Sequence, residues 1–295
     1  MKYSSIFKLK KWIGVFINSK LSHIVPDKQY LKLIGYTKGI KINFENPMTF
    51  NEKLQWLKLY DRNPEYTRMV DKYEAKRYVA EKIGEQYIIP TLGVWDDPED
   101  IDFNKLPDKF VLKCNHNSGK GMVICKDKST LDLEKVKKGL KEGLKQNYYL
   151  TSREWPYKDV KRRVIAEQFM IDGENECLTD YKFFCFGGEP KFMYRSMDNA
   201  VDPHTDFFDM NYNRLDMRMR DPNSDSVPPK PECFEEMKRL ARVLSANIPH
   251  LRVDFYEING KVYFGELTFY HCGGFARIYP EKWMDTLGDW IELPD

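Results

Sequence analysis

The chain has 295 residues, of which 42% are hydrophobic and 14% aromatic, so it can bury a sizeable core across two or three lobes. Its 47 Lys and Arg residues against 45 Asp and Glu residues leave a formal charge of +2, which argues against nucleic acid as a partner. The 6 cysteines form no CxxC pair, and the 5 histidines add no zinc-ligand spacing, so we expect reduced thiols and no structural metal.

The N-terminal stretch FKLKKWIGVFINSKL combines a basic start with an apolar patch at residues 12–17. This patch is far shorter than the ~20 residues that a membrane span requires. No small-residue cleavage site follows it, so we expect a cytoplasmic protein without a secretory signal. A basic helix with one apolar face can bind peripherally to the inner face of an anionic membrane, dock on another protein, or pack on its own domain.

Helical patterns come first along the chain. The segment TFNE at residues 49–52 matches a capping box, so a helix is expected to start there. A second helical pattern covers residues 65–83 and ends at Gly84, a frequent helix terminator; its Lys76 and Arg77 are expected to face solvent. Further helices are expected at residues 131–146 and 232–247.

Short β-rich runs begin near residue 87. Those expected before the first hairpin are residues 87–90, 92–95, 110–114, 122–125 and 163–170. The dipeptide Gly187-Gly188 then joins residues 178–186 to residues 190–196 in a predicted tight hairpin. The last hairpin pairs residues 251–258 with residues 261–269 around Asn259-Gly260, the dipeptide preferred in type I′ turns.

Two carboxylates mark the last hairpin, with Asp254 on its first strand and Glu266 on its second. Counting outward from the Asn259-Gly260 turn places Asp254 opposite Gly265, so ideal pairing would point the two carboxylates to opposite faces. We expect a β-bulge, or a longer loop in place of the tight turn, that brings both to one face. Such a pair suits Mg²⁺ carrying nucleotide phosphates, and the alternative is two solvated carboxylates on an exposed face.

A second candidate site lies in FVLKCNHNSGKGMVIC, where a strand ends near Lys113 and a polar loop, residues 115–120, returns through Gly121. The small residues Ser118, Gly119 and Gly121 allow backbone amides to close over phosphate oxygens beside the charge of Lys113. The segment lacks GxxxxGK[ST] and precedes a strand, so it is not a Walker A loop. The alternative is an ordinary glycine hairpin with an exposed lysine.

The order of these parts resembles the ATP-grasp enzymes, in which a lysine strand and glycine loop precede a hinge strand and a late hairpin with metal-binding acids. More narrowly, residues 30–293 resemble the TupA-like ATP-grasp proteins of bacterial surface-polysaccharide clusters, named for teichuronopeptide biosynthesis. The resembling segments are MTFNEKLQWLKLYDRNP, DKYEAKRYV, FVLKCNHNSGKG, RVIAEQFM, DYKFFCFGGEPKFM and LRVDFY…GKVYFGELTFY…GGF.

The resemblance implies an α+β, ATP-grasp fold in which two α+β lobes clamp ATP. A helical N-terminal region would cover residues 1–85, and a small lobe with the glycine loop and the hinge strand would cover residues 86–170. The C-terminal lobe with the metal-binding hairpin would cover residues 171–295.

The resemblance also implies which residues hold the nucleotide. Lys113 would be the first phosphate lysine. The flexible loop over the β- and γ-phosphates would consist of Asn117, Ser118, Gly119, Lys120 and Gly121. Glu167 would mark the hinge strand, and the backbone near Gln168 and Phe169 would pair with the adenine edge.

On the C-terminal lobe, Lys182 would be the second phosphate lysine, oriented by Asp180; the alternative is a surface strand with a salt bridge. Asp254 and Glu266 would bind Mg²⁺. Thr268 stands where ATP-grasp enzymes commonly have a metal-binding asparagine, and a hydroxyl is a weaker magnesium ligand.

An acyl-phosphate intermediate and a carboxylate substrate both need positive partners. Arg252, two residues before Asp254 and so on the same strand face, is the first catalytic and substrate-binding candidate. The other substrate-binding candidates are Arg195, His271, Gly273 and Arg277. Each of these could instead be a solvated surface group.

By resemblance, the chain is a Mg²⁺- and ATP-dependent carboxylate-amine ligase that forms an acyl phosphate. The acceptor would be a uronic acid or similar carboxylate in a surface glycan or its lipid-linked precursor, and the amine an amino acid. The alternatives are phosphorylation of a sugar hydroxyl, glycosyl transfer in the same pathway, and nucleotide binding without turnover.

Overall fold

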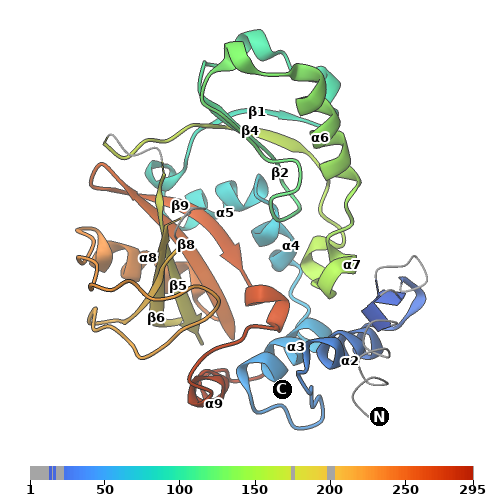
Figure 1. The fold of residues 1–295 in the computed structure, drawn as a ribbon, viewed down its shortest axis with the longest axis vertical. Coiled ribbons are helices and arrows are strands. Elements are labelled where there is room, and N and C mark those ends of the chain that lie inside the picture. The colour runs from blue at the N-terminus through green and yellow to red at the C-terminus, as the bar shows by residue number, and fades with distance from the viewer. Residues whose placement is uncertain (1–12, 15, 18–22, 174–176, 198–202, 295) are drawn as a thin grey trace.

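Two antiparallel sheets dominate the computed structural model, which describes residues 13–14, 16–17, 23–173, 177–197 and 203–294 (Figure 1). The predicted α+β class is therefore confirmed. Most of the basic N-terminal stretch with its expected amphipathic helix lies outside the described residues. Among the helices that are described, none is long and apolar enough to cross a membrane.

The small sheet has the strand order β1-β4-β2-β3. Its strands are β1 (Thr91–Trp95), β2 (Phe110–Cys114), β3 (Val123–Cys125) and β4 (Val164–Gln168). Helix α6 (Leu133–Lys145) packs on this sheet, with Leu140 in the same hydrophobic core as Phe110 and Leu112. The expected strand at residues 87–90 is wrong: it contains the end of a 3₁₀ turn, Glu85–Tyr87, and an irregular connection to β1.

The large sheet has the strand order β7-β6-β5-β8-β9. Its strands are β5 (Thr179–Phe186), β6 (Glu189–Met197), β7 (Thr205–Asp209), β8 (His250–Ile258) and β9 (Lys261–Thr268). Both predicted hairpins are confirmed, and all four of their turn residues adopt the positive φ angles for which Gly-Gly and Asn-Gly are suited. Strand β7 was not predicted.

The two faces of the large sheet have different neighbours. Helix α8 (Phe234–Ser245) covers one face, where its Phe234 meets Phe183 of β5. On the other face, Phe184 and Phe186 of β5 lie among buried aromatic residues that include Phe192. Because side chains alternate along a strand, Asp180 and Lys182 share this second face but line cavities at its far end.

Helices from both ends of the chain, and one short helix from its middle, complete the fold. They are α2 (Asp27–Lys38), α3 (Phe50–Tyr60), α4 (Glu65–Val70), α5 (Glu74–Ile83), α7 (Tyr149–Ser152) and α9 (Lys282–Asp289). The capping box at the start of α3 is confirmed, because Thr49 and Glu52 exchange both side chain to backbone hydrogen bonds. A single hydrophobic core joins α3, α4 and α5 to the large sheet, and Figure 1 shows α4 and α5 between the two sheets.

The expected single helix over residues 65–83 is two helices, α4 and α5. Asp71 has an extended backbone with ψ of 110°, and its carboxylate accepts hydrogen bonds from the backbone N–H groups of Tyr73 at 2.9 Å and Glu74 at 3.4 Å. This side chain competes with helical hydrogen bonding across residues 71–74, so the first helix ends and a new one begins at Glu74. The break leaves Lys72 in the turn between the helices, and α5 ends before Gly84 as predicted.

Replacing Phe184 by Ala is expected to lower the free energy of unfolding by ~3–5 kcal/mol, because the ring is fully buried and stacks on Phe192 at 4.4 Å between centroids. Val227→Ala is the control, since Val227 is 56% exposed and such surface changes stay within about 0.5 kcal/mol. Chemical denaturation measures both variants. Equal stability of the two would contradict the assigned core.

Candidate active site

An apolar cavity of about 290 Å³ lies between the two sheets. Met122 and Ile124 line it from the small-sheet side, and Tyr256 and Phe264 line it from the large sheet. Met122 is 48% exposed and Ile124 is 53% exposed, so both present apolar surface that a bound group can cover. The cavity therefore suits a flat, largely apolar ligand; we call it the base cavity.

Four charged residues also line the base cavity: Lys113, Lys126, Glu167 and Asp180. Strand β4 ends at Gln168, and Gln168 and Phe169 line the same cavity where the chain leaves the sheet. The expected phosphate lysine and the expected hinge residues thus lie around one cavity.

Glu167 is buried between two lysines. Its carboxylate is 2.5 Å from the ammonium of Lys113 and 2.7 Å from that of Lys76. Burial alone would raise the pKa of Glu167, but the two cations reverse this and lower it. The expectation that Lys76 faces solvent is wrong, because it is buried and also donates to the carbonyl of Ile89 at 2.7 Å.

The predicted β-bulge in the last hairpin is present. The register of β8 and β9 shifts between Asp254 and Phe255, so Asp254 pairs with Glu266 rather than with Gly265. Residues directly opposite each other in an antiparallel pair share a face. Asp254 and Glu266 therefore lie side by side on the face that also carries Lys182, which pairs with Asp254 on the other side.

Arg252 holds both carboxylates. Its guanidinium donates two bonds to Asp254, each at 2.7 Å, and one to Glu266 at 2.8 Å. Burial opposes the ionisation of Glu266, but the nearby cations lower the pKa of Glu266 to about 2. Arg252 has the largest effect among them, followed by Lys72, Lys182 and Lys113. Asp254 is only 1% exposed, so these hydrogen bonds take the place of the water contacts that its carboxylate loses on burial.

His271 completes this cluster rather than facing solvent. The ring is buried, and its Nδ1 lies 2.8 Å from the guanidinium of Arg252. Burial and the neighbouring Arg252 cation lower the pKa of His271 well below its ordinary value. The neutral ring can accept the arginine bond through Nδ1 and so fixes the direction of the guanidinium.

Lys182 pairs with two carboxylates on the same face, at 2.9 Å from Asp180 and 3.1 Å from Asp254. Burial alone would lower the pKa of Lys182, but Asp254 and Asp180 raise it above its ordinary value. Lys182 therefore stays charged, and Asp180 helps to orient it.

The two carboxylates of the hairpin supply hard oxygen donors of the kind that Mg²⁺ prefers. The hydroxyl of Thr268 lies 3.3 Å from Glu266 and can add one weaker oxygen. In the described parts of the chain, no group of three or more His, Cys, Asp and Glu residues is placed to hold a metal ion. The chemistry of the donor set fits Mg²⁺, with phosphate oxygens or water completing the coordination. Both oxygens of Asp254 accept hydrogen bonds from Arg252, so a metal bound there would share Asp254 with that cation or displace it.

The loop between β2 and β3 is fixed at its base and exposed at its tip. The side chain of Asn117 is buried and donates to the carbonyls of Lys120 at 3.0 Å and Gly143 at 3.2 Å. Ser118, Gly119 and Lys120 are exposed. Gly119 and Gly121 have φ angles of 78° and 79°, a region that favours glycine.

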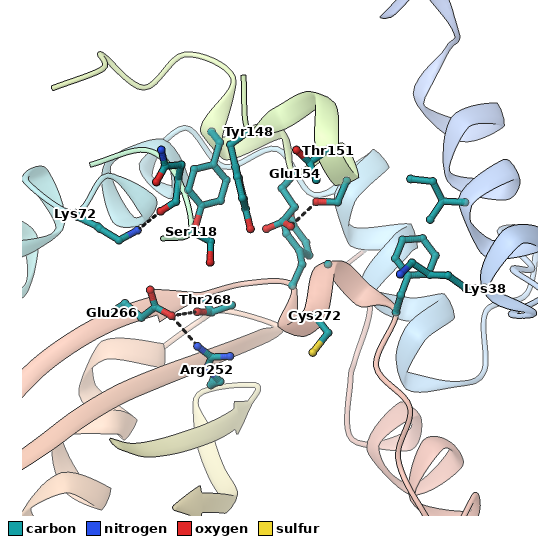
Figure 2. A pocket seen from close by; sticks show the side chains of 17 residues that line it. Lys38, Lys72, Ser118, Tyr148, Thr151, Glu154, Arg252, Glu266, Thr268 and Cys272 are labelled. Atoms are coloured by element: carbon teal, nitrogen blue, oxygen red, sulfur yellow. Dashed lines mark hydrogen bonds and ion pairs between the residues drawn. The ribbon is translucent and has the colours of Figure 1, made fainter. Parts of the chain in front are cut away.

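Figure 2 shows a second cavity, of about 350 Å³, beside the carboxylate cluster. Lys72 and Ser118 lie on one wall, and Arg252 and Glu266 lie on the wall opposite. The remaining wall includes Tyr148, Thr151, Ser152, Glu154, Tyr157, Lys38 and Gly273. Most of these groups are polar, so we call this the polar cavity.

A third cavity, of about 680 Å³, adjoins the polar cavity and shares Cys272 and Phe275 with it. Lys182, Arg220 and Arg277 supply its positive charge. Asp180 and Asp221 also line it and offset part of this charge by pairing with Lys182 and Arg220. We call it the cationic cavity. The carboxylate cluster thus lies where three cavities approach one another.

Two residues that were expected to bind substrate, Arg195 and Arg277, do not lie within the carboxylate cluster. Arg195 pairs with Tyr181 and Asp206, and the alternation along β6 puts it on the face opposite Lys182 and Asp254. It is therefore not part of the cluster. Arg277 is exposed at the rim of the cationic cavity and donates to a backbone carbonyl, that of Lys38, at 2.8 Å.

Sequence reasoning missed Lys72, Tyr148 and Glu154 as wall residues. Glu154 is buried, accepts a hydrogen bond from Ser152 at 2.6 Å, and has a pKa that burial raises. Nothing in the local sequence marks Glu154 or Tyr148. For Lys72 the only signal was its place in DKYEAKRYV, a segment that carried the resemblance without an assigned role.

Replacing Lys76 by Met is expected to lower the free energy of unfolding by about 3 kcal/mol at pH 7, because Glu167 loses one of two partners in a buried site. Because folding lowers the pKa of Glu167, its ionised carboxylate stabilises the folded protein at pH values above the ordinary pKa of a glutamate. This stabilisation is lost as the pH falls through the pKa that Glu167 has in the folded protein. The difference in the free energy of unfolding between the wild-type protein and Lys76→Met should therefore shrink below about pH 4.5.

Arg77→Met is the control, because Arg77 is the next residue on α5 and is exposed. Urea denaturation at pH 7 and at pH 4 measures the three proteins. A deficit that is absent at pH 7, or equally large at both pH values, would contradict the buried ion pair.

Comparison with known proteins identifies the family. The model of the family described as TupA-like ATP-grasp matches residues 52–292. No curated protein matches the chain at a significant level.

Several solved structures resemble the chain at low identity. D-alanine-D-alanine ligase from Helicobacter pylori has 14% identity and a TM-score of 0.41, with 90% of this chain and 69% of that chain covered. The ligase of the same name from Bacillus anthracis, complexed with ATP, has 14% identity and a TM-score of 0.39, with 68% of this chain and 53% of that chain covered. The ATP-grasp ligase PsnB, with minimal precursor, Mg and ADP, has 10% identity and a TM-score of 0.42, with 89% of this chain and 66% of that chain covered.

This chain thus spans between 53% and 69% of the length of these solved proteins. The family match covers most of the sequence and includes both β8 and β9 with their carboxylates. The chain belongs to the TupA-like ATP-grasp family.

Proposed function

We propose that this protein is a Mg²⁺-dependent ligase that uses ATP to join a carboxylate to an amine through an acyl phosphate. The observation that carries the proposal is the cluster of Asp254 and Glu266 with Arg252, located between the base cavity and the polar cavity. Membership of an ATP-grasp family supports it independently.

In this proposal adenine occupies the base cavity, between Met122 and Ile124 on one side and Phe264 on the other. The phosphates extend past Lys113 and Lys182 toward Glu266. Backbone amides of the exposed loop tip, residues 118–120, close over the terminal phosphates. The positive φ angles of Gly119 and Gly121 support this role, because amides in such turns point to a common anion.

The reaction proposed has two steps. An oxygen of the acceptor carboxylate attacks the γ-phosphorus, the bond from that phosphorus to the bridging β-γ oxygen breaks, and ADP leaves. The amine nitrogen then attacks the acyl carbon, loses a proton, and displaces inorganic phosphate. Magnesium, when held by Asp254 and Glu266, offsets the charge of the phosphate oxygens. Arg252 lines the polar cavity beside both carboxylates, so its positive charge can stabilise the charge that develops on the reacting oxygens.

The acceptor is proposed to enter through the polar and cationic cavities. The hydroxyls of Tyr148 and Tyr157 suit a polyhydroxylated sugar. Arg277, whose guanidinium has no carboxylate partner among the described residues, suits its carboxylate. We therefore infer a uronic acid or similar carboxylate in a bacterial surface glycan or its lipid-linked precursor, with an amino acid as the amine. The reaction would take place in the cytoplasm, at the inner face of the membrane for a lipid-linked acceptor.

The test is ADP release from Mg²⁺-ATP in the presence of glucuronic- and galacturonic-acid glycans and a mixture of amino acids. Lys113→Ala and Glu266→Gln are each expected to reduce acceptor-dependent ADP release about 100-fold or more, because each removes charge that faces the phosphates. Lys261→Ala and Glu292→Gln are the matched controls, since both residues are exposed and line none of the three cavities.

Mass spectrometry of the glycan decides the reaction type. A mass increase of one amino acid minus water supports the ligase. A phosphorylated sugar would instead identify a kinase, and a reaction that requires a sugar nucleotide would identify a glycosyltransferase. ATP binding with no turnover would identify a binding protein, and a wild-type protein that does not bind ATP would contradict the proposal altogether.

A further inference from the structure

Glu154 follows a turn that contacts with α2 hold in place. Its neighbour Arg153 has a φ of 55° and a ψ of 37°, a region that a residue with a side chain adopts only at a cost. The guanidinium of Arg153 is buried over the ring of Tyr30, 3.7 Å from its centroid, and pairs with Asp27 at 3.1 Å. Arg153 thus packs against α2, and the next residue, Glu154, lines the polar cavity.

A buried lysine on α3, Lys58, supports the same turn. Its ammonium donates to the carbonyls of Ser152 at 2.8 Å and Gly273 at 2.5 Å, so it joins the end of α7 to the 3₁₀ turn His271–Gly274 after β9. Burial raises the pKa of Glu154, and the nearby charge of Lys58 opposes this increase. Glu154 is therefore held rigidly, in surroundings that make its carboxylate a stronger base than an exposed glutamate.

One oxygen of Glu154 is available to a ligand. Its Oε1 accepts a hydrogen bond from the hydroxyl of Ser152 at 2.6 Å. Among the described residues, Oε2 accepts no hydrogen bond and Glu154 forms no ion pair, although the residue is only 5% exposed. Figure 2 shows the carboxylate pointing into the polar cavity, on the wall opposite Arg252. A buried carboxylate oxygen without a donor is costly, so a ligand that donates to Oε2 would be stabilised there.

The proposed reaction indicates which donor this is. The acyl phosphate would form beside Glu266, which lines the same cavity as Glu154, so the attacking amine must approach through this cavity. At neutral pH most of an amine is an ammonium, which is a cationic donor but has no lone pair for attack. We propose that Glu154 binds the ammonium group of the amine substrate and accepts its proton, as the general base of the second step. This inference rests on the proposed function, because it assumes the acyl phosphate.

The proton and electron transfers of this step balance. The ammonium gives one proton to Oε2 of Glu154, which frees the lone pair of the nitrogen. The lone pair forms the bond to the acyl carbon, and the bond from that carbon to the phosphate oxygen breaks. A second proton of the nitrogen leaves with the phosphate, and Glu154 returns its proton to solvent. Glu154 thus acts in amide formation and not in formation of the acyl phosphate.

The test compares two nucleophiles that differ in their need for a base. Hydroxylamine is largely neutral at pH 7 and converts acyl phosphates to hydroxamates without a catalytic base. With Mg²⁺-ATP and glucuronic- and galacturonic-acid glycans, Glu154→Gln is expected to reduce amide formation from mixed amino acids ~100-fold or more. Hydroxamate formation with hydroxylamine should change by less than about threefold. Mass spectrometry of the glycan measures both products.

Glu142→Gln is the matched control, because Glu142 is exposed on α6 and lines none of the three cavities. Glu154→Asp is the second test variant, since it keeps the charge on a shorter side chain. Its amide formation should fall less than that of Glu154→Gln, with hydroxamate formation again preserved. This variant carries the test where thermal unfolding shows that Glu154→Gln is not folded.

The outcomes separate the inference from the proposed function. Equal loss of amide and hydroxamate in a folded variant would show that Glu154 serves acceptor binding or the shape of the cavity. Unchanged amide formation would show that it is not the base. Either result overturns the inference while the ligase activity stands. A wild-type protein that forms neither amide nor hydroxamate would overturn the proposed function itself.

Discussion

The site depends on the β-bulge in the hairpin of β8 and β9, where Gly265 is one extra residue in β9. Without the bulge after Asp254, Gly265 would pair with Asp254, and Glu266 would point to the face that α8 covers. With the bulge, the two carboxylates lie together where Arg252 can hold both. A glycine suits this position, because a Cβ added at Gly265 would lie 3.1 Å from the carbonyl oxygen of Asp254. The bulge therefore determines which side chains can meet phosphates and metal.

Charge balance explains why so many ionised groups persist in a partly buried region. Glu167 is offset by Lys76 and Lys113, and Asp254 by Arg252 and Lys182. In both the Glu167 and the Asp254 cluster, short hydrogen bonds between opposite charges offset the free-energy cost of burying those charges. Lys72 differs from these cations because its partner is a neutral carbonyl.

Local patterns predicted those parts of the fold that local chemistry determines. Gly187-Gly188 and Asn259-Gly260 identified both hairpins because only certain residues tolerate positive φ, and the capping box located the start of α3. The α+β class and the family followed from the order of such segments. The bulge was expected from chemistry rather than from pattern, because two separated carboxylates on a sheet suggested a shared ligand.

Long-range packing decided what the sequence could not show. Lys76 looked like a surface residue of a helix, but β4 brings Glu167 against it, a contact between residues 91 positions apart. Arg195 looked available, but its register on β6 turns it to the other face.

A crystal structure with Mg²⁺ and AMP-PNP tests the central claim most directly. We predict the metal on Asp254 and Glu266 and adenine in the base cavity; a nucleotide bound elsewhere, or a metal away from both carboxylates, would contradict this account.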